Sequence, residues 1–211
     1  MKDIKLTQET LLKLYEGLKP QIQKRLEEFQ SVPPSEYFYE LLYCLLTPQS
    51  KAANAEIVVG KLKELDFARF PIDPEPILRN PEHYIRFHKK KSDYLVSAQL
   101  QQAELLTLLE TNQDASNARA ELIHTFKGLG MKEATHFLRN IGRNNGLAIL
   151  DRHILRILFH LRVITNLPTM LSYQRYKEIE FQFQNFSKGI SIPLDELDLL
   201  MWYIETGQIL K

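Results

Sequence analysis

Apolar residues recur every three or four positions through most of the chain, and this spacing constrains its fold more than any other feature. One helical face near the N-terminus carries Leu11, Leu14, Tyr15 and Leu18. No segment shows a convincing alternation of apolar and polar residues, which is the pattern of a half-buried strand. The sequence therefore predicts an all-α fold.

Polar caps and breaks predict where individual helices begin and end. Thr7, Asp114 and Asp151 precede helical stretches and are expected N-caps, because their side-chain oxygens can accept from free backbone N–H groups. Pro20 is expected to start a new turn. A single long helix is expected from about residue 89 to residue 110.

Two breaks stand out as domain boundaries. Pro33-Pro34 interrupts the first helical stretch, and a glycine-containing loop spans residues 142–146. We expect residues 33–144 to form a central helical domain that carries the hairpin described below. The segments 1–32 and 145–211 are expected to pack together as a second helical domain.

Composition limits the classes of function. The formal net charge is +1, so any surface that binds nucleic acid must be local. The one cysteine, Cys44, lies in an apolar run, where we expect a small buried residue. A disulfide within the chain and a cysteine-ligated metal cluster are both excluded. We find no leader pattern and no apolar run of membrane-spanning length, so a cytoplasmic protein without membrane contacts is expected.

Gly128 and Gly130 suit a tight turn between two helices, because glycine accepts positive φ and has no side chain to block a ligand. Backbone N–H groups at such a turn and at the start of the next helix can hold a phosphate. The alternative is a helix-helix turn with glycine caps and no ligand.

Lys132 follows this turn within the first turn of the next helix. A neutral lysine amine can attack carbon and form a Schiff base with an opened sugar. The alternative is an exposed lysine that faces solvent.

Asp151 comes nineteen residues after Lys132. A fixed carboxylate can stabilise the positive charge that builds on a sugar when its glycosidic bond breaks. The alternative is a purely structural N-cap. Together with the glycine turn, Lys132 and Asp151 favour an enzyme that acts on the sugars of DNA.

At these residues the chain resembles the helix-hairpin-helix-GPD superfamily of DNA glycosylases. Residues 126–156 resemble its prokaryotic second branch of 8-oxoguanine DNA glycosylase/AP lyases, as does the run from residue 200 to the C-terminus. The resemblance implies two helical domains with an active-site cleft between them. It also implies a bifunctional enzyme that excises 8-oxoguanine from damaged double-stranded DNA, with Lys132 as nucleophile and Asp151 as charge stabiliser.

The same resemblance implies a monomer that acts in the prokaryotic cytoplasm, at the nucleoid, without an organic cofactor. A structural monovalent cation could be held by hairpin carbonyls around Phe126 and Leu129. Relatives of the endonuclease III type carry four cysteines for an iron-sulfur cluster, which this chain lacks. Two alternatives stay open, namely a glycosylase for another damaged base and a non-catalytic helix-hairpin-helix module that only binds DNA.

Enzymes that flip a nucleotide out of the duplex must fill the hole that it leaves. The resemblance gives this wedge role to Gln49 and Phe87. The alternative for Gln49 is a polar residue at a helix start. An aromatic side chain next to four cations is unusual for a core residue but fits a wedge, which supports Phe87.

Cations near Phe87 could contact DNA phosphates, and Lys89 and Lys91 are the candidates. The alternative is a solvated helix start. His153, two residues after Asp151, matches a phosphate-contacting histidine of eukaryotic relatives. Its alternative is a partly buried histidine with satisfied hydrogen bonds.

The resemblance assigns base recognition to Trp202 and Lys211. Trp202, the single tryptophan, would stack on the flipped purine, whereas its helical spacing alone indicates a core residue. The terminal carboxylate of Lys211 would accept the N7–H that 8-oxoguanine has and guanine lacks. Its alternative is a frayed chain end.

Overall fold

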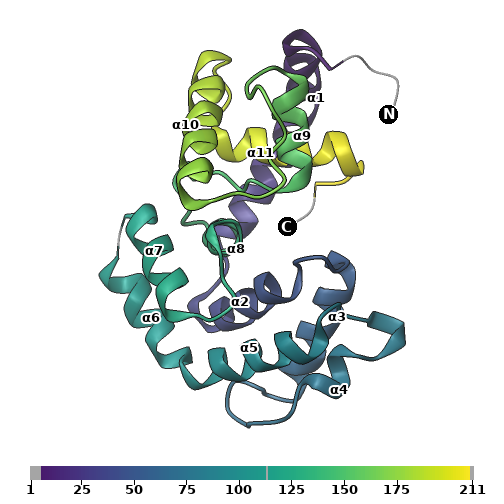
Figure 1. Ribbon diagram of the computed structural model, residues 1–211, viewed down its shortest axis with the longest axis vertical. Coiled ribbons are helices and arrows are strands. Elements are labelled where there is room, and N and C mark those ends of the chain that lie inside the picture. Colours follow the sequence, from purple (N-terminus) through teal and green to yellow (C-terminus); the bar gives the residue numbers. More distant parts are fainter. Residues whose placement is uncertain (1–5, 113, 210–211) are drawn as a thin grey trace. The chain divides into compact units, whose positions relative to one another are not determined.

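The computed structural model describes residues 6–112 and 114–209, and these ranges are helical apart from turns and loops (Figure 1). They contain eleven α-helices and two short 3-10 turns, Pro34–Glu36 and Pro81–His83, and no strand. The predicted all-α fold is therefore confirmed. No helix within these ranges is long and apolar enough to cross a membrane.

The chain divides into two compact units. The first joins the segment that ends at Ser31 to the segment that begins at Gly142, and the second is the continuous segment Val32–Ile141. The helices of the first unit are α1 (Gln8–Gln30), α9 (Arg152–His160), α10 (Tyr173–Gly189) and α11 (Leu194–Thr206). Those of the second are α2 (Tyr37–Leu46), α3 (Ala52–Glu64), α4 (Glu75–Leu78), α5 (His88–Leu100), α6 (Gln102–Thr111), α7 (Ala115–Thr125) and α8 (Met131–Asn140).

In the first unit α11 is the central helix, because α1, α9 and α10 all pack against it. Thr7 caps α1 as predicted, since its hydroxyl accepts the N–H of Thr10 at 3.2 Å. The helix then continues through Pro20, so the predicted new turn at that residue is wrong. Tyr15 and Ile22 are buried on either side of the proline, and this packing outweighs the backbone hydrogen bond that a proline removes.

In the second unit the central helix is α2, which packs against α3, α5 and α8. All its residues except Tyr37 and Glu40 are buried, so it forms the core of the unit. Cys44 is fully buried, as predicted, and burial raises the pKa of its thiol. We therefore find an inert packing residue rather than a reactive thiol.

The long helix predicted from residue 89 to residue 110 is wrong, because the chain breaks into α5 and α6 at Gln101. The side chains at this junction bind the loop after α3. Gln99 donates to the carbonyl of Phe67, and Gln102 donates to that of Ala68. These two bonds satisfy two carbonyls of that loop.

The glycine turn joins α7 to α8, which pack against each other, and α8 also packs on α2. Asp114 caps α7 as predicted, with its carboxylate accepting the N–H of Asn117 at 2.9 Å. Gly128 has φ +97°, and a side chain there would overlap the ring of Tyr94 on α5. The turn therefore requires glycine both for its backbone conformation and for its packing.

Candidate active site and DNA-binding residues

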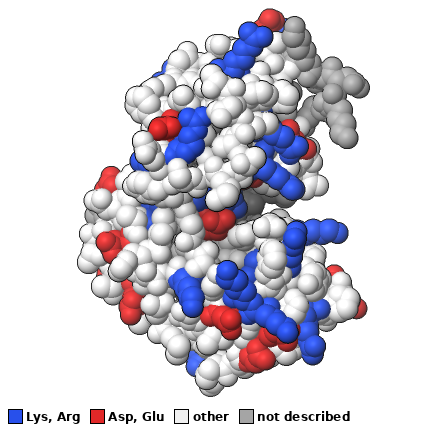
Figure 2. All heavy atoms as spheres, viewed as in Figure 1, with Lys and Arg blue, Asp and Glu red and all other residues white. Residues whose placement is uncertain are grey.

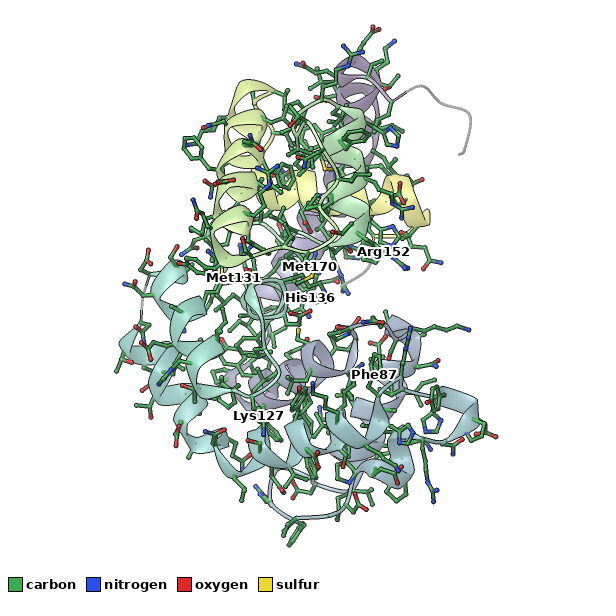
Figure 3. The ribbon with its side chains drawn as sticks, viewed as in Figure 1. Phe87, Lys127, Met131, His136, Arg152 and Met170 are labelled. Carbon is green, nitrogen blue, oxygen red and sulfur yellow. The ribbon has the colours of Figure 1, made fainter. Side chains whose placement is uncertain are left out.

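Lys132 lies in the first turn of α8, where the chain leaves the glycine turn. Gly130 is the N-cap residue, and within the described chain no side chain caps this helix. The first N–H groups of α8 thus have no capping side chain, an arrangement that fits an anion such as a DNA phosphate. Lys127, labelled in Figure 3, belongs to the same turn and is exposed.

The Lys132 side chain is 24% exposed, so it is largely covered yet reaches the surface. Its Nζ lies 4.0 Å from Oε1 of Glu133, the next residue. The charge of Lys132 adds to the effect of burial in lowering the pKa of Lys91, and it opposes the rise that burial causes in the pKa of Cys44. An amine in this position can reach a substrate while most of its stem is shielded from water.

Asp151 is the N-cap of α9, as predicted. Its Oδ1 accepts the N–H groups of His153 and Ile154, at 2.8 and 2.9 Å. Both bonds go to Oδ1, so Oδ2 takes no part in capping the helix. The carboxylate therefore lies at the positive end of the helix dipole.

The extended segment before Asp151 is held by α10, a feature that the sequence did not reveal. The hydroxyl of Tyr176 donates to the carbonyl of Ala148 at 2.6 Å and accepts the N–H of Leu150 at 3.2 Å. Glu180, also buried, accepts the N–H of Ala148 at 3.0 Å. These three bonds fix the backbone that leads to Asp151.

His153 and Trp202 meet between α9 and α11, with ring centroids 5.2 Å apart. Trp202 is partly exposed rather than a core residue. Glu205 on α11 lies 2.9 Å from Nδ1 of His153 and 3.1 Å from the guanidinium of Arg156. The structure thus gathers Asp151, His153 and Trp202 within the first unit, and Lys211 lies outside the described residues.

Gln49 and Phe87 are both exposed and both have left-handed backbones, with φ of 55° and 61°. Phe87 protrudes from the start of α5 (Figure 3), and its ring is covered on one side by the guanidinium of Arg86, 4.8 Å from the ring centroid. Non-glycine residues rarely adopt positive φ, and such outliers cluster at functional sites.

The structure contradicts a phosphate contact by Lys91, whose side chain is only 4% exposed and donates to protein acceptors. Lys91 lies on the buried side of the first turn of α5, whereas the preceding lysines face solvent. Lys89 is exposed. On the face of the second unit shown in Figure 2, basic and acidic side chains lie side by side, so the positive charge there is local.

Among the described residues no group of three or more histidine, cysteine, aspartate or glutamate side chains could hold a metal ion. In the hairpin, the carbonyl of Phe126 accepts the N–H of Leu129 at 3.2 Å. A cation that uses carbonyl ligands at this turn stays a prediction.

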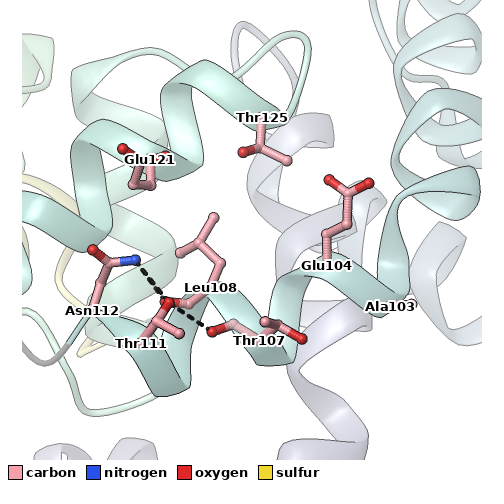
Figure 4. A pocket seen from close by; sticks show the side chains of 8 residues that line it. All are labelled: Ala103, Glu104, Thr107, Leu108, Thr111, Asn112, Glu121 and Thr125. Atoms are coloured by element: carbon pink, nitrogen blue, oxygen red, sulfur yellow. Dashed lines mark hydrogen bonds between the residues drawn. The ribbon is translucent and has the colours of Figure 1, made fainter.

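Two hollows are lined by other residues. One, of about 460 Å³, lies between α6 and α7, where Asn112 donates to the hydroxyl of Thr111 (Figure 4). The other, of about 510 Å³, lies in the first unit beside Gly146 and Gln184. Neither is lined by a residue that the sequence analysis assigned to the reaction.

The sequence model of the Ogg-HhH family, described as 8-oxoguanine DNA glycosylase, matches residues 22–192. The chain belongs to this family. The match includes the glycine turn, Lys132 and Asp151, and the predicted superfamily resemblance is confirmed.

Individual relatives agree with this assignment. An 8-oxoguanine DNA glycosylase/AP lyase of Fusobacterium nucleatum is 38% identical over 208 residues, which cover 94% of this chain and 95% of the relative. The crystal structure of the Methanocaldococcus jannaschii 8-oxoguanine DNA glycosylase is 33% identical, with a TM-score of 0.86 over 97% of this chain and 95% of that one. The same archaeal glycosylase/lyase in complex with a 15mer DNA containing 8-oxoguanine is 34% identical, with a TM-score of 0.85 over 96% of this chain and 100% of that one.

Proposed function

We propose that this protein excises 8-oxoguanine from damaged double-stranded DNA through a Schiff base on Lys132 and then cleaves the strand by β-elimination. The activity follows from the family: the protein is an 8-oxoguanine DNA glycosylase/AP lyase that acts on DNA containing 8-oxoguanine. The observation that carries the assignment of the nucleophile is the partly covered amine of Lys132 at the start of α8, next to the glycine turn.

In the first step the neutral amine of Lys132 attacks C1′ of the damaged nucleotide, and the bond from C1′ to the base breaks. The base leaves with the electron pair and takes up a proton. The amine then loses a proton, and its lone pair forms the C=N bond of the Schiff base as the C1′–O4′ bond breaks and O4′ takes up a proton. Removal of a C2′ proton expels the 3′ phosphate, and hydrolysis of the imine frees the lysine.

Asp151 stabilises the positive charge that develops on the sugar as the base departs. Its position at the N-terminus of α9 supports this role, because the capping bonds fix the carboxylate and the helix dipole favours its charge. The bonds from Tyr176 and Glu180 to the preceding segment support the same role by limiting its movement.

Contacts to the DNA are assigned to residues of both units. Backbone N–H groups at Gly128 and Gly130, together with Lys89 and His153, bind phosphates and fix the position on the duplex without reading its sequence. The exposed, left-handed Gln49 and Phe87 occupy the space that the flipped nucleotide leaves.

Base recognition is assigned to Trp202, which stacks on the flipped purine, and to the terminal carboxylate of Lys211. The partial exposure of Trp202 beside His153 supports stacking. A peptide tag after Lys211 is therefore expected to weaken the discrimination between 8-oxoguanine and guanine.

The enzyme is proposed to act as a monomer in which Lys132 and Asp151 of the same chain work together. Its place of action is the prokaryotic cytoplasm, at the nucleoid, where its DNA substrate lies. Bacterial and archaeal relatives support this location.

Borohydride trapping tests the mechanism. Wild-type protein is expected to form a covalent adduct with a duplex that carries 8-oxoguanine opposite cytosine, and Lys132→Gln is expected to form none. Lys127→Gln, which removes the same charge from the same turn, should still form the adduct. An equal adduct yield from Lys132→Gln and wild type would rule out Lys132 as nucleophile. Trapping on an abasic site but not on 8-oxoguanine would point to another base as substrate.

A further inference from the structure

Gln49 and Phe87 lie on two separate loops, yet both adopt the left-handed conformation that non-glycine residues rarely keep unless their surroundings hold them. One loop connects α2 to α3, and the other leads into α5. A wedge made of two loop residues works better if both are fixed relative to each other before DNA arrives, because ordering them on binding costs free energy.

A single buried side chain bonds to both flanks of Gln49. The ammonium of Lys91 donates to the carbonyl of Leu46 at 2.6 Å, to the carbonyl of Pro48 at 2.7 Å and to the hydroxyl of Ser50 at 3.1 Å. These three acceptors use the three protons of the ammonium, so the buried charge is fully hydrogen-bonded.

The same lysine reaches the loop of Phe87. Its backbone N–H donates to the carbonyl of Phe87 at 3.0 Å, which is the first helical bond of α5 and does not depend on the side chain. The hydroxyl of Ser50, already bound to Lys91, also accepts the N–H of Arg86 at 3.0 Å. Lys91 and Ser50 therefore connect the two loops through a short chain of hydrogen bonds.

Burying this charge has a cost. The pKa of Lys91 is lowered to about 8, chiefly by desolvation; Glu133 opposes this change and the neighbouring Lys132 adds to it. A lysine whose only role was to face solvent would not be in this position, because an exposed ammonium avoids the desolvation penalty.

We propose that Lys91 is a positioning residue that holds Gln49 and Phe87 as one preformed wedge. This inference rests on the proposed wedge roles of those two residues. Loss of the ammonium would let the loops move independently, and a displacement of about 1 Å in a positioned group can cost up to about a hundredfold in rate.

The test compares two single-turnover rates on matched duplexes: excision of 8-oxoguanine opposite cytosine, and strand cleavage at an abasic site opposite cytosine. The abasic site has no base to extrude, so its cleavage rate reports the catalytic steps that both reactions share. The ratio of the excision rate to this cleavage rate therefore reports how much the wedge contributes to base extrusion. Lys91→Met is expected to lower this ratio by about tenfold or more. Lys61→Met, at an exposed position on α3, is the control and should leave the ratio unchanged.

Lys91→Met leaves three acceptors without a donor and could unfold the protein, so Ser50→Ala provides a milder variant. It removes the link to Arg86 while Lys91 keeps its two carbonyl partners, and it is expected to lower the same ratio by about threefold to tenfold. If Lys91→Met does not fold, Ser50→Ala decides the question alone.

Gln49→Ala and Phe87→Ala separate the two levels of the proposal. If neither variant lowers the ratio, the wedge assignment is wrong and the role of Lys91 is wrong with it. If both lower the ratio while folded Lys91→Met and Ser50→Ala leave it unchanged, the wedge stands and the role of Lys91 is overturned. The double variant Lys91→Met/Phe87→Ala provides a further check. If it lowers the ratio no more than the more impaired of the two single variants does, Lys91 and Phe87 act together in one wedge.

Discussion

At the residue scale, three consecutive lysines show how one sequence motif can contain different roles. Lys89 and Lys90 are exposed, whereas Lys91 is buried and bonded to the Gln49 loop. The sequence could not separate them, because the acceptors for Lys91 lie more than forty residues earlier in the chain. By contrast, Asp151 was predictable as a cap, since its partners are the N–H groups two and three residues later.

One substitution separates the charge of Asp151 from its role as a helix cap. Asparagine is as good an N-cap as aspartate, so Asp151→Asn should change the free energy of unfolding by less than about 0.5 kcal/mol. It should lower the rate of 8-oxoguanine excision by about a hundredfold or more, because the charge that stabilises the sugar cation is lost. Single-turnover excision and urea denaturation measure the two quantities.

The control is Asp114→Asn, which makes the same change at the N-cap of α7. It should retain both activity and stability. Excision by Asp151→Asn at the wild-type rate would contradict the electrostatic role and leave Asp151 as a cap only.

The burial of Lys91 predicts a pH dependence of stability. Its folded pKa of about 8 lies below the ordinary lysine value, so between pH 8 and about 10.4 the unfolded chain binds a proton that the folded chain has released. The free energy of unfolding of wild type, relative to Lys91→Met, should therefore rise across this window, by at most about 3 kcal/mol. Urea denaturation of both proteins at several pH values checks this, and a flat difference would show that the pKa of Lys91 is not lowered.

At the element scale, local signals predicted where helices begin better than where they stop or break. The caps at Thr7 and Asp114 hold because they depend on bonds within one helical turn. The break at Gln101 and the continuity of α1 through Pro20 depend on packing against segments distant in sequence. Intrinsic propensity is a weak guide where tertiary contacts of this kind decide.

The glycine turn yields a prediction that belongs to this scale. Gly128→Ala should lower the free energy of unfolding by about 1–2 kcal/mol or more, because alanine is strained at φ +97° and its methyl group would overlap Tyr94. It should also weaken binding to duplex DNA, since the turn would shift. Gly60→Ala, inside α3 with no atom near the added methyl group, should instead stabilise by about 0.5–1 kcal/mol. Equal stability of the two variants would contradict the assigned role of Gly128.

At the scale of the whole molecule, the two proposed catalytic residues belong to different units of one chain. Lys132 lies in the unit Val32–Ile141, and Asp151 lies in the unit built from both ends of the chain. Local motifs and the resemblance were enough to propose both residues from the sequence. The contacts that hold them, such as Tyr176 on the segment before Asp151, come from elements folded together over long sequence distances.

A monomer that carries out the reaction within one chain predicts no complementation. An equimolar mixture of Lys132→Gln and Asp151→Asn should remain as inactive toward 8-oxoguanine as the variants do separately. Recovery of substantial activity on mixing would show that Lys132 of one copy works with Asp151 of another, and would contradict the monomer.

The most direct test of the central claim is to locate the borohydride-trapped adduct by mass spectrometry. After trapping on the 8-oxoguanine duplex and digestion of DNA and protein, the account predicts the sugar remnant on a tryptic peptide from Gly128 to Arg139. That peptide would be left uncleaved at Lys132, because the modified lysine no longer fits trypsin. A remnant on any other lysine, or on the N-terminal amine, would contradict the assignment of Lys132 as the nucleophile.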